Sequence, residues 1–166
     1  SAAARIRALS MSQRLLDGLE PSGDVNMADY LAAICHALVN AEEPRKTSLN
    51  LKIASIAMPV GMAQQFGLIV NELLTNSIKH AFTDRPNGVV TVVLHDDGNR
   101  LVLDYSDNGV GLQGKQAKTD RNGKGRSLLD RIIRGLGGEA EISGTDGFRI
   151  SISFAHPAMK FPTRAA

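Results

Sequence analysis

The sequence has few of the features that would place it among disulfide-bonded, membrane-spanning or nucleic-acid-binding proteins. Its 166 residues contain a single cysteine, Cys35, which excludes an internal disulfide framework and fits a reducing compartment. The formal net charge of +2 is too small to indicate nucleic acid as a partner on electrostatics alone. No apolar run approaches the roughly 20 residues that a membrane-spanning helix needs, so any membrane attachment would involve regions outside this chain. We therefore expect a cytoplasmic protein in which Cys35 is a buried, structural thiol.

The sequence also lacks targeting signals and the common phosphate-binding motifs. Its first residues, Ser-Ala-Ala-Ala-Arg, include neither an initiator methionine nor the apolar segment of a signal peptide, so we expect a fragment of something longer. The Gly-x-x-x-x-Gly-Lys-Ser/Thr spacing of a P-loop is missing, and the first strand–helix junction carries no dinucleotide fingerprint. These absences disfavour the usual nucleotide-binding folds.

The patterns that are present alternate between helix and strand, as is typical of an α+β domain. Helices are predicted over residues 2–19, 24–40, 60–82 and 127–136, and strands over residues 47–57, 89–95, 101–106, 139–143 and 148–154. Asp24 or Asn26 would cap the second helix, and the run Asp-Asp-Gly-Asn at 96–99 predicts a hairpin. The sequence therefore predicts a two-layer α/β sandwich, in which helices cover one face of a mixed, largely antiparallel sheet and further helices precede it.

The stretch Asn-Glu-Leu-Leu-Thr-Asn-Ser-Ile-Lys-His-Ala-Phe, residues 71–82, holds the polar residues most suggestive of chemistry. In an α-helix Glu72, Asn76 and Lys79 would share one face, because they are spaced by four and then three residues. Oxygen ligands suit a hard cation such as magnesium, and a lysine suits phosphate. An ordinary solvated helix face is the alternative reading of this stretch alone.

Two glycine-containing segments lie further along the chain. Asp107-Asn108-Gly109-Val110-Gly111-Leu112 follows a strand, so Asp107 could accept a hydrogen bond from an exocyclic amine while the glycines let the backbone turn sharply. Gly123-Lys124-Gly125-Arg126-Ser127 opens the last helix and could bind an anion with its backbone N–H groups. Each segment alone is weak evidence, since an Asp-Asn-Gly turn and a Gly-x-Gly helix start are both common.

Taken together and in this order, the three segments resemble the boxes of the ATP-binding fold (GHKL, or Bergerat, fold) shared by gyrase, Hsp90, histidine kinases and MutL. The resemblance covers about residues 60–155, and Asn71 to Phe82 looks like the N-box of that fold. The sequence of this N-box is most similar to that of bacterial histidine kinases of the subfamily allied to the HWE kinases, although the HWE signature Trp-x-Glu is absent.

The resemblance implies roles for individual residues. Glu72 and Asn76 would be catalytic, with Asn76 ligating magnesium, and Asp107 would read adenine. The loop 112–122 would be a lid that closes over ATP. The residues implied to contact the nucleotide are Asn76, Lys79, His80, Asp107, Gly109, Gly111, Gly123, Gly125, Arg126, Ser127 and Thr145.

The resemblance also implies how the chain is organised. Residues 1–23 would be the remnant of a dimerisation and phosphoacceptor helix, residues 24–45 a connecting helix, residues 46–157 the ATP-binding domain and residues 158–166 a tail. The acceptor motif His-x-x-x-Lys-Asn is missing, so the acceptor histidine would lie outside this chain.

The implied function is that of the ATP-binding catalytic module of a two-component sensor histidine kinase. The module would bind Mg-ATP and transfer the γ-phosphoryl to a histidine of the full-length kinase, for relay to a response regulator. An anti-sigma-type serine kinase on the same fold is the first alternative, motivated by the missing acceptor motif. A non-catalytic interaction module that retains the fold is the second.

Overall fold

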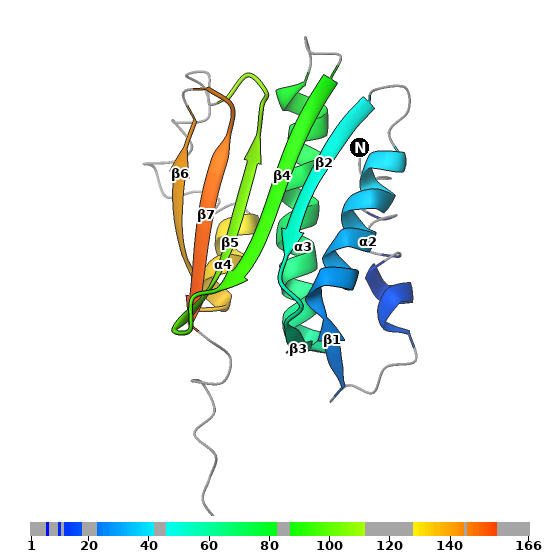
Figure 1. Ribbon diagram of the computed structural model, residues 1–166, viewed down its shortest axis with the longest axis vertical. Coiled ribbons are helices and arrows are strands. Elements are labelled where there is room, and N and C mark those ends of the chain that lie inside the picture. Colours follow the sequence, from blue (N-terminus) through cyan, green and yellow to red (C-terminus); the bar gives the residue numbers. More distant parts are fainter. Residues whose placement is uncertain are drawn as a thin grey trace, which may run out of the picture.

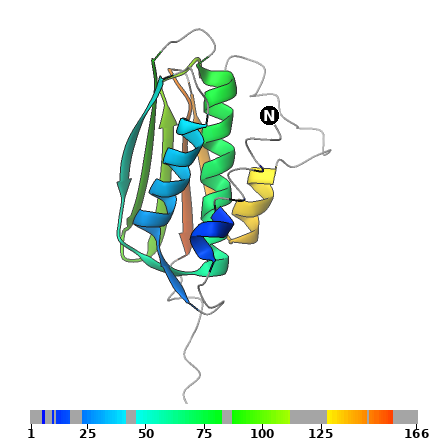
Figure 2. The ribbon, with the colours of Figure 1, turned by 90° about the vertical axis from the view of Figure 1, so that its right-hand side faces the viewer.

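The computed structural model describes residues 6, 10, 12–17, 23–41, 46–82, 87–111, 128–144 and 146–155, and these residues form two layers. One layer is a twisted sheet (Figure 1). Figure 2, turned by 90°, shows helices α2, α3 and α4 together on one face of that sheet. The predicted α+β sandwich with helices on one face is therefore confirmed.

The sheet is mixed but mainly antiparallel, as predicted. Its strand order is β2-β4-β5-β7-β6, and only the β2–β4 pair is parallel within this sheet. The strands are β2 (Lys46–Ile53), β4 (Asn87–Asp96), β5 (Arg100–Asp107), β6 (Glu139–Ser143) and β7 (Arg149–Ala155). The predicted hairpin joins β4 to β5: Asp97 Oδ1 accepts hydrogen bonds from the N–H groups of Asn99 (2.9 Å) and Arg100 (2.6 Å). This turn leads directly into β5, the strand that ends at the candidate site.

The core lies between the sheet and the helices because three strands alternate between buried and more exposed residues. Every second residue of β5, of β7 and of β4 up to Leu94 is buried, including Leu103 and Ile152, while the intervening residues are half-buried or exposed. From the helix side, Phe66 packs against Phe154 of β7 with ring centroids 4.7 Å apart. Burying such side chains contributes about 1.5–3 kcal/mol each. The burial of this apolar face is therefore the main contribution that holds the elements of the site in place.

The short strands that precede helices α2 (Met27–Asn40) and α3 (Val60–Asn76) pair with each other and are called the β1–β3 clip. Asn26 caps α2, since its Oδ1 accepts a hydrogen bond from the N–H of Ala28 at 2.9 Å. Residues Asp24–Asn26 form β1, which pairs with β3 (Ala57–Pro59). The prediction of one strand over 47–57 was therefore wrong at its end, because β2 stops at Ile53 and residues 54–56, before β3, belong to no strand.

Only part of the predicted helix over residues 2–19 falls within the described residues. Residues 12–16 are helical, and Leu16 is buried in the common core. Ser12 Oγ forms a hydrogen bond with the phenol of Tyr30 in α2, which ties this segment to the domain. Ile6 and Leu15 remain exposed.

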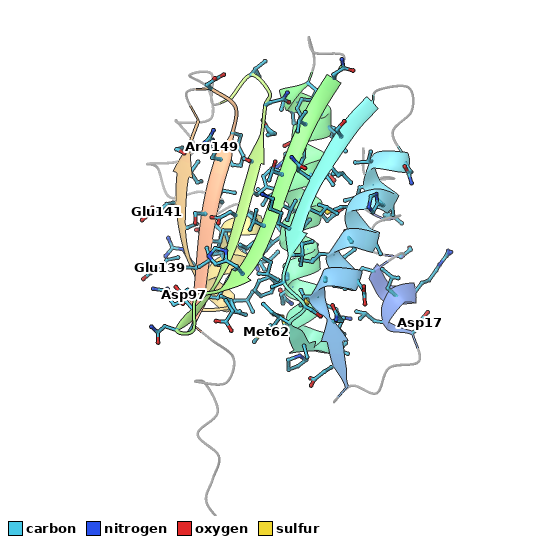
Figure 3. The ribbon with its side chains drawn as sticks, viewed as in Figure 1. Asp17, Met62, Asp97, Glu139, Glu141 and Arg149 are labelled. Carbon is cyan, nitrogen blue, oxygen red and sulfur yellow. The ribbon has the colours of Figure 1, made fainter. Side chains whose placement is uncertain are left out.

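The last helix, α4 (Leu128–Gly135), ends as the Gly-Gly pair predicted. Gly137 has φ +66°, which an L-residue rarely adopts, and the N–H of Gly138 donates to the carbonyl oxygen of Ile133 at 2.8 Å. The chain then enters β6, an edge strand whose residues are all exposed. Figure 3 shows Glu139 and Glu141 on this edge. Charged side chains there disfavour pairing with a second sheet.

Cys35 is fully buried in α2, and burial raises the pKa of its thiol to about 12. The thiol is therefore protonated at neutral pH, which confirms the structural role expected for it. Among the described residues, no helix has both the length and the hydropathy that crossing a bilayer requires.

Candidate functional site

The candidate site is a cavity of about 250 Å³ where the C-terminal end of α3 meets the end of β5. Its walls come from segments that are distant in sequence: α3 and the helical turn that follows it, the loop after β5, α4, and the residue before β7. The lining residues are Leu73, Asn76, Ser77, His80, Ala81, Asp107, Val110, Gly111, Leu129 and Phe148. An apolar slot with a few polar groups suits a flat ring that carries hydrogen-bonding edges.

Helix α3 does not end at Asn76 but continues as a π-helix, η1 (Ser77–Ala81). A π-helix has more residues per turn than an α-helix. Lys79 is therefore turned further from Asn76 than α-helical spacing predicts, while His80 stays close to that face. Accordingly Asn76 and His80 line the cavity, whereas Lys79, half-buried, is not among its lining residues. The expectation that Glu72, Asn76 and Lys79 share one face holds only for a regular α-helix.

Glu72 and Asn76 differ in exposure although one helical turn separates them. Glu72 is 6% exposed and does not line the cavity, whereas Asn76 is exposed at its wall. The carboxamide of Asn76 can thus reach a ligand directly. Within the described residues no group of three or more His, Cys, Asp or Glu side chains could hold a metal ion. A magnesium ion held here would need oxygen ligands from phosphates and water beside Asn76, which is usual for magnesium nucleotides.

Asp107, the last residue of β5, is the most constrained polar side chain of the cavity. It is 7% exposed, and its Oδ1 accepts hydrogen bonds from the backbone N–H groups of Gly109 (2.9 Å) and Phe148 (3.2 Å). Its Oδ2 accepts a hydrogen bond from Ser77 Oγ at 2.5 Å. These three hydrogen bonds leave one acceptor position of the carboxylate, and because Asp107 lines the cavity, a base carrying an exocyclic amine could donate to it.

The loop after β5 depends on glycines for two different reasons. A Cβ on Gly109 would lie 2.3 Å from the Cβ of Ala81, so only glycine lets this loop pack against η1. The N–H of Val110 completes that contact by donating to the carbonyl oxygen of Ala81 at 3.1 Å. Gly111 has φ +67° and lines the cavity itself. Gly109 therefore shapes the site without lining it, and Gly111 forms part of the wall.

The remaining predicted contacts lie outside the described residues: Gly123, Gly125, Arg126, Ser127, Thr145 and the 112–122 loop. Conversely, sequence reasoning missed Ser77 and Tyr105, which support Asp107, and the apolar wall that includes Leu129 and Phe148. A signal for Tyr105 was available, since residues two apart in a strand share a face and Tyr105 precedes Asp107 by two.

The phenol of Tyr105 makes a testable contribution to stability at alkaline pH. Tyr105 is 1% exposed, and burial raises its pKa, while the hydrogen bond to Ser77 lowers it to a smaller extent. In the unfolded chain a tyrosine ionises near its usual value of 10.0, so above that pH the unfolded state loses a proton that the folded state retains. Stability is therefore unaffected below about pH 10 and falls above it, by about 1.4 kcal/mol per pH unit for a fully protected group.

Urea unfolding at pH 9 and near pH 11 checks this expectation. We expect Tyr105→Phe to lose less stability over that interval than the parent chain, by about 1 kcal/mol. Tyr30→Phe is a parallel case: burial also raises the pKa of Tyr30, so this variant should likewise lose less stability than the parent chain over the interval. Equal losses in the parent and in Tyr105→Phe would show that the phenol ionises freely in the folded state.

The comparisons with known proteins agree with this geometry. Residues 61–158, more than half of the chain, match the family described as histidine kinase-, DNA gyrase B- and HSP90-like ATPase. Blue-light-activated histidine kinase 2 of Erythrobacter litoralis is 27% identical over 146 residues, which are 84% of this chain and 42% of that protein. Serine-protein kinase RsbW of Listeria innocua is 35% identical over 72 residues, 40% of this chain and 46% of that protein. The chain thus spans less than half the length of either relative.

A solved structure shows the same fold. The histidine kinase domain of the Erythrobacter litoralis EL346 blue-light activated histidine kinase superposes with a TM-score of 0.75 at 26% sequence identity. The match covers 92% of this chain and 73% of that domain. The chain therefore belongs to the family of histidine kinase-, DNA gyrase B- and HSP90-like ATPases, and its fold is that of a histidine kinase catalytic domain.

Proposed function

We propose that this chain is the ATP-binding catalytic module of a two-component sensor histidine kinase. The observation that carries the proposal is the cavity itself: a buried carboxylate, Asp107, lies at its inner wall and the exposed carboxamide of Asn76 lines it as well. The chain's membership of an ATPase family supports ATP as the ligand. The acceptor would be a histidine outside this chain, and a response regulator would receive the phosphoryl group.

Among the described residues, some would contact the base and others the magnesium ion and the phosphates. Leu73, Val110 and Phe148 offer apolar surface to the purine, and Asp107 accepts a hydrogen bond from its amine. Asn76 would supply an oxygen ligand to magnesium, which when bound would neutralise charge on the triphosphate. Because phosphoryl transfer needs mainly positioning and charge stabilisation, these contacts would contribute to orienting the γ-phosphoryl group.

Further residues complete the proposed site. We assign Lys79, His80, Gly123, Gly125, Arg126 and Ser127 to the phosphates, Gly109 and Gly111 to the shape of the base pocket, and Thr145 to adenine. For Glu72, one turn before Asn76 in α3, we propose that its carboxylate orients the attacking group. The loop 112–122 would close over the nucleotide, and residues 1–23 would belong to the unit that carries the acceptor.

A calorimetric titration with ATP, with and without magnesium, tests the proposal. We expect binding that depends on magnesium, and we expect Asn76→Ala to weaken Mg-ATP binding about tenfold, because a direct ion ligand is lost. The control is Asn50→Ala, which makes the same chemical change at an exposed position of β2. ATP affinity that ignores magnesium, together with unchanged binding by Asn76→Ala, would contradict the proposal.

A serine kinase is the second candidate, and the similarity to serine-protein kinase RsbW is the observation that favours it. Incubation with labelled ATP and candidate acceptors separates the two. An acid-labile phosphohistidine on a supplied acceptor helix supports the histidine kinase, and an acid-stable phosphoserine supports the alternative. Nucleotide binding without any transfer would indicate a non-catalytic interaction module.

A further inference from the structure

Behind Asp107, two buried hydroxyl groups form a chain of hydrogen bonds that ends on its carboxylate. The phenol of Tyr105 donates to Ser77 Oγ at 2.7 Å, and Ser77 Oγ donates to Asp107 Oδ2 at 2.5 Å. Tyr105 is 1% exposed and Ser77 3% exposed. The chain connects β5 to the π-helix η1 and back to the end of β5, so it couples the two elements that hold the inner wall of the cavity.

The direction of this chain determines what the carboxylate can do. Since the Tyr105 proton occupies Ser77 Oγ, the Ser77 proton points at Asp107 rather than into the cavity. A carboxylate has about four acceptor positions. Hydrogen bonds from Ser77, Gly109 and Phe148 fill three of them and leave one on Oδ2. Asp107 is thus fixed as an acceptor toward the cavity, with both oxygens held in place.

A fixed acceptor discriminates between purines that differ in one group. An exocyclic amine, as in adenine, donates a hydrogen bond to the open position. A keto oxygen at the same ring carbon, as in hypoxanthine or guanine, would place two acceptors against each other in a buried site. Binding sites built around a buried hydrogen bond reject the wrong partner strongly, because a polar group is then left unpaired.

We propose that Ser77 and Tyr105 are positioning residues that set the base selectivity of this site by fixing Asp107 as an acceptor for the amine of the purine. The inference rests on the proposed function, because it presumes that a nucleoside triphosphate occupies the cavity. It goes beyond that function by assigning selectivity to two residues that do not themselves read the base.

Titration with ATP and with inosine triphosphate, which differ in this amine and keto pair, tests the inference. The readout is the ratio of the two dissociation constants in the presence of magnesium. We expect the parent chain to favour ATP by about 100-fold. Ser77→Ala should lower that ratio about tenfold, and Tyr105→Phe, which removes only the phenolic oxygen, about threefold. Thermal unfolding of each variant verifies that it is folded.

Matched controls make the same chemical changes elsewhere. Ser106→Ala alters a serine of β5 between Tyr105 and Asp107 in sequence, and Tyr30→Phe alters the buried tyrosine of α2; neither residue lines the cavity. Both controls should keep the parent ratio. A ratio unchanged in Ser77→Ala and Tyr105→Phe, or equal weakening of both nucleotides, would overturn the inference while the proposed function stands. Failure of the parent chain to bind either nucleotide would overturn both.

Discussion

Replacing Gly147 with alanine is expected to destabilise the chain by about 3 kcal/mol and to displace Asp107 from its hydrogen bonds. Gly147 has φ +79°, a conformation that costs an L-residue about 1–2 kcal/mol. In addition, the new Cβ would lie 2.1 Å from the carbonyl oxygen of Asp107, which is a backbone atom and cannot rotate away. Because the neighbouring Phe148 N–H bonds the Asp107 carboxylate, relief of this clash disturbs the site as well as the fold.

The control for Gly147→Ala is Gly98→Ala in the β4–β5 hairpin. Gly98 also has a positive φ, +91°, but a Cβ there would meet nothing within 4 Å. The difference between the two variants in urea unfolding therefore isolates the contact with Asp107. We expect Gly98→Ala to lose about 1 kcal/mol and to retain nucleotide binding. Equal losses in both variants would mean that the carbonyl of Asp107 can move without cost.

The sheet and its pairing could be predicted because local patterns decide them. Strands β4, β5 and β7 each alternate between buried and half-buried residues, and Asp97 and Gly98 specify the tight turn between the first two. The long apolar stripe of α3 likewise required a sheet to pack against. Antiparallel neighbours and helices on one face followed from these patterns alone.

Features that depend on tertiary contacts could not be predicted. In the β1–β3 clip, Val25 pairs with Met58. Strands of three residues carry no local pattern that predicts a pairing partner so distant in sequence. The end of β2 at Ile53 is likewise a tertiary feature: the N–H of Ala54 still donates to the carbonyl oxygen of Leu94 in β4, and the chain then leaves the sheet. The prediction of one strand over residues 47–57 came from the alternation of apolar and polar residues, and tertiary packing ended the strand at Ile53.

The site shows the same division between local and distant causes. Asn76, Asp107 and Gly111 were predicted because each belongs to a segment with its own recognisable chemistry, and the structure brings all three to one cavity. The π-helix that moves Lys79 away from the Asn76 face could not be predicted, because its residues fit an α-helix equally well. The hydrogen bond from Ser77 to Asp107 joins residues 30 positions apart and exists only once η1 packs against β5.

Asp107→Ala is expected to weaken Mg-ATP binding roughly 100-fold, the largest effect on binding that we predict. The substitution removes the acceptor for the purine amine. It also leaves three donors without their partner: the buried hydroxyl of Ser77, the buried N–H of Gly109 and the half-buried N–H of Phe148. We therefore expect a loss of stability of about 2 kcal/mol in addition. Calorimetric titration with Mg-ATP and urea unfolding measure the two effects separately.

Asp104→Ala is the control that distinguishes an effect on the site from an effect on the fold, because it removes a carboxylate from the same strand at a residue that does not line the cavity. Asp104 is half-buried on the opposite face of β5, where its carboxylate lies 3.9 Å from Nδ1 of His95. Its loss should leave ATP affinity unchanged.

Asp107→Asn adds a second comparison. It keeps the size of the side chain but replaces one acceptor oxygen with a donor, so it should recover most of the stability and little of the ATP affinity. Parent-like affinity in Asp107→Ala would mean that the base binds elsewhere, since Asp107 is the one carboxylate among the described residues that line this cavity.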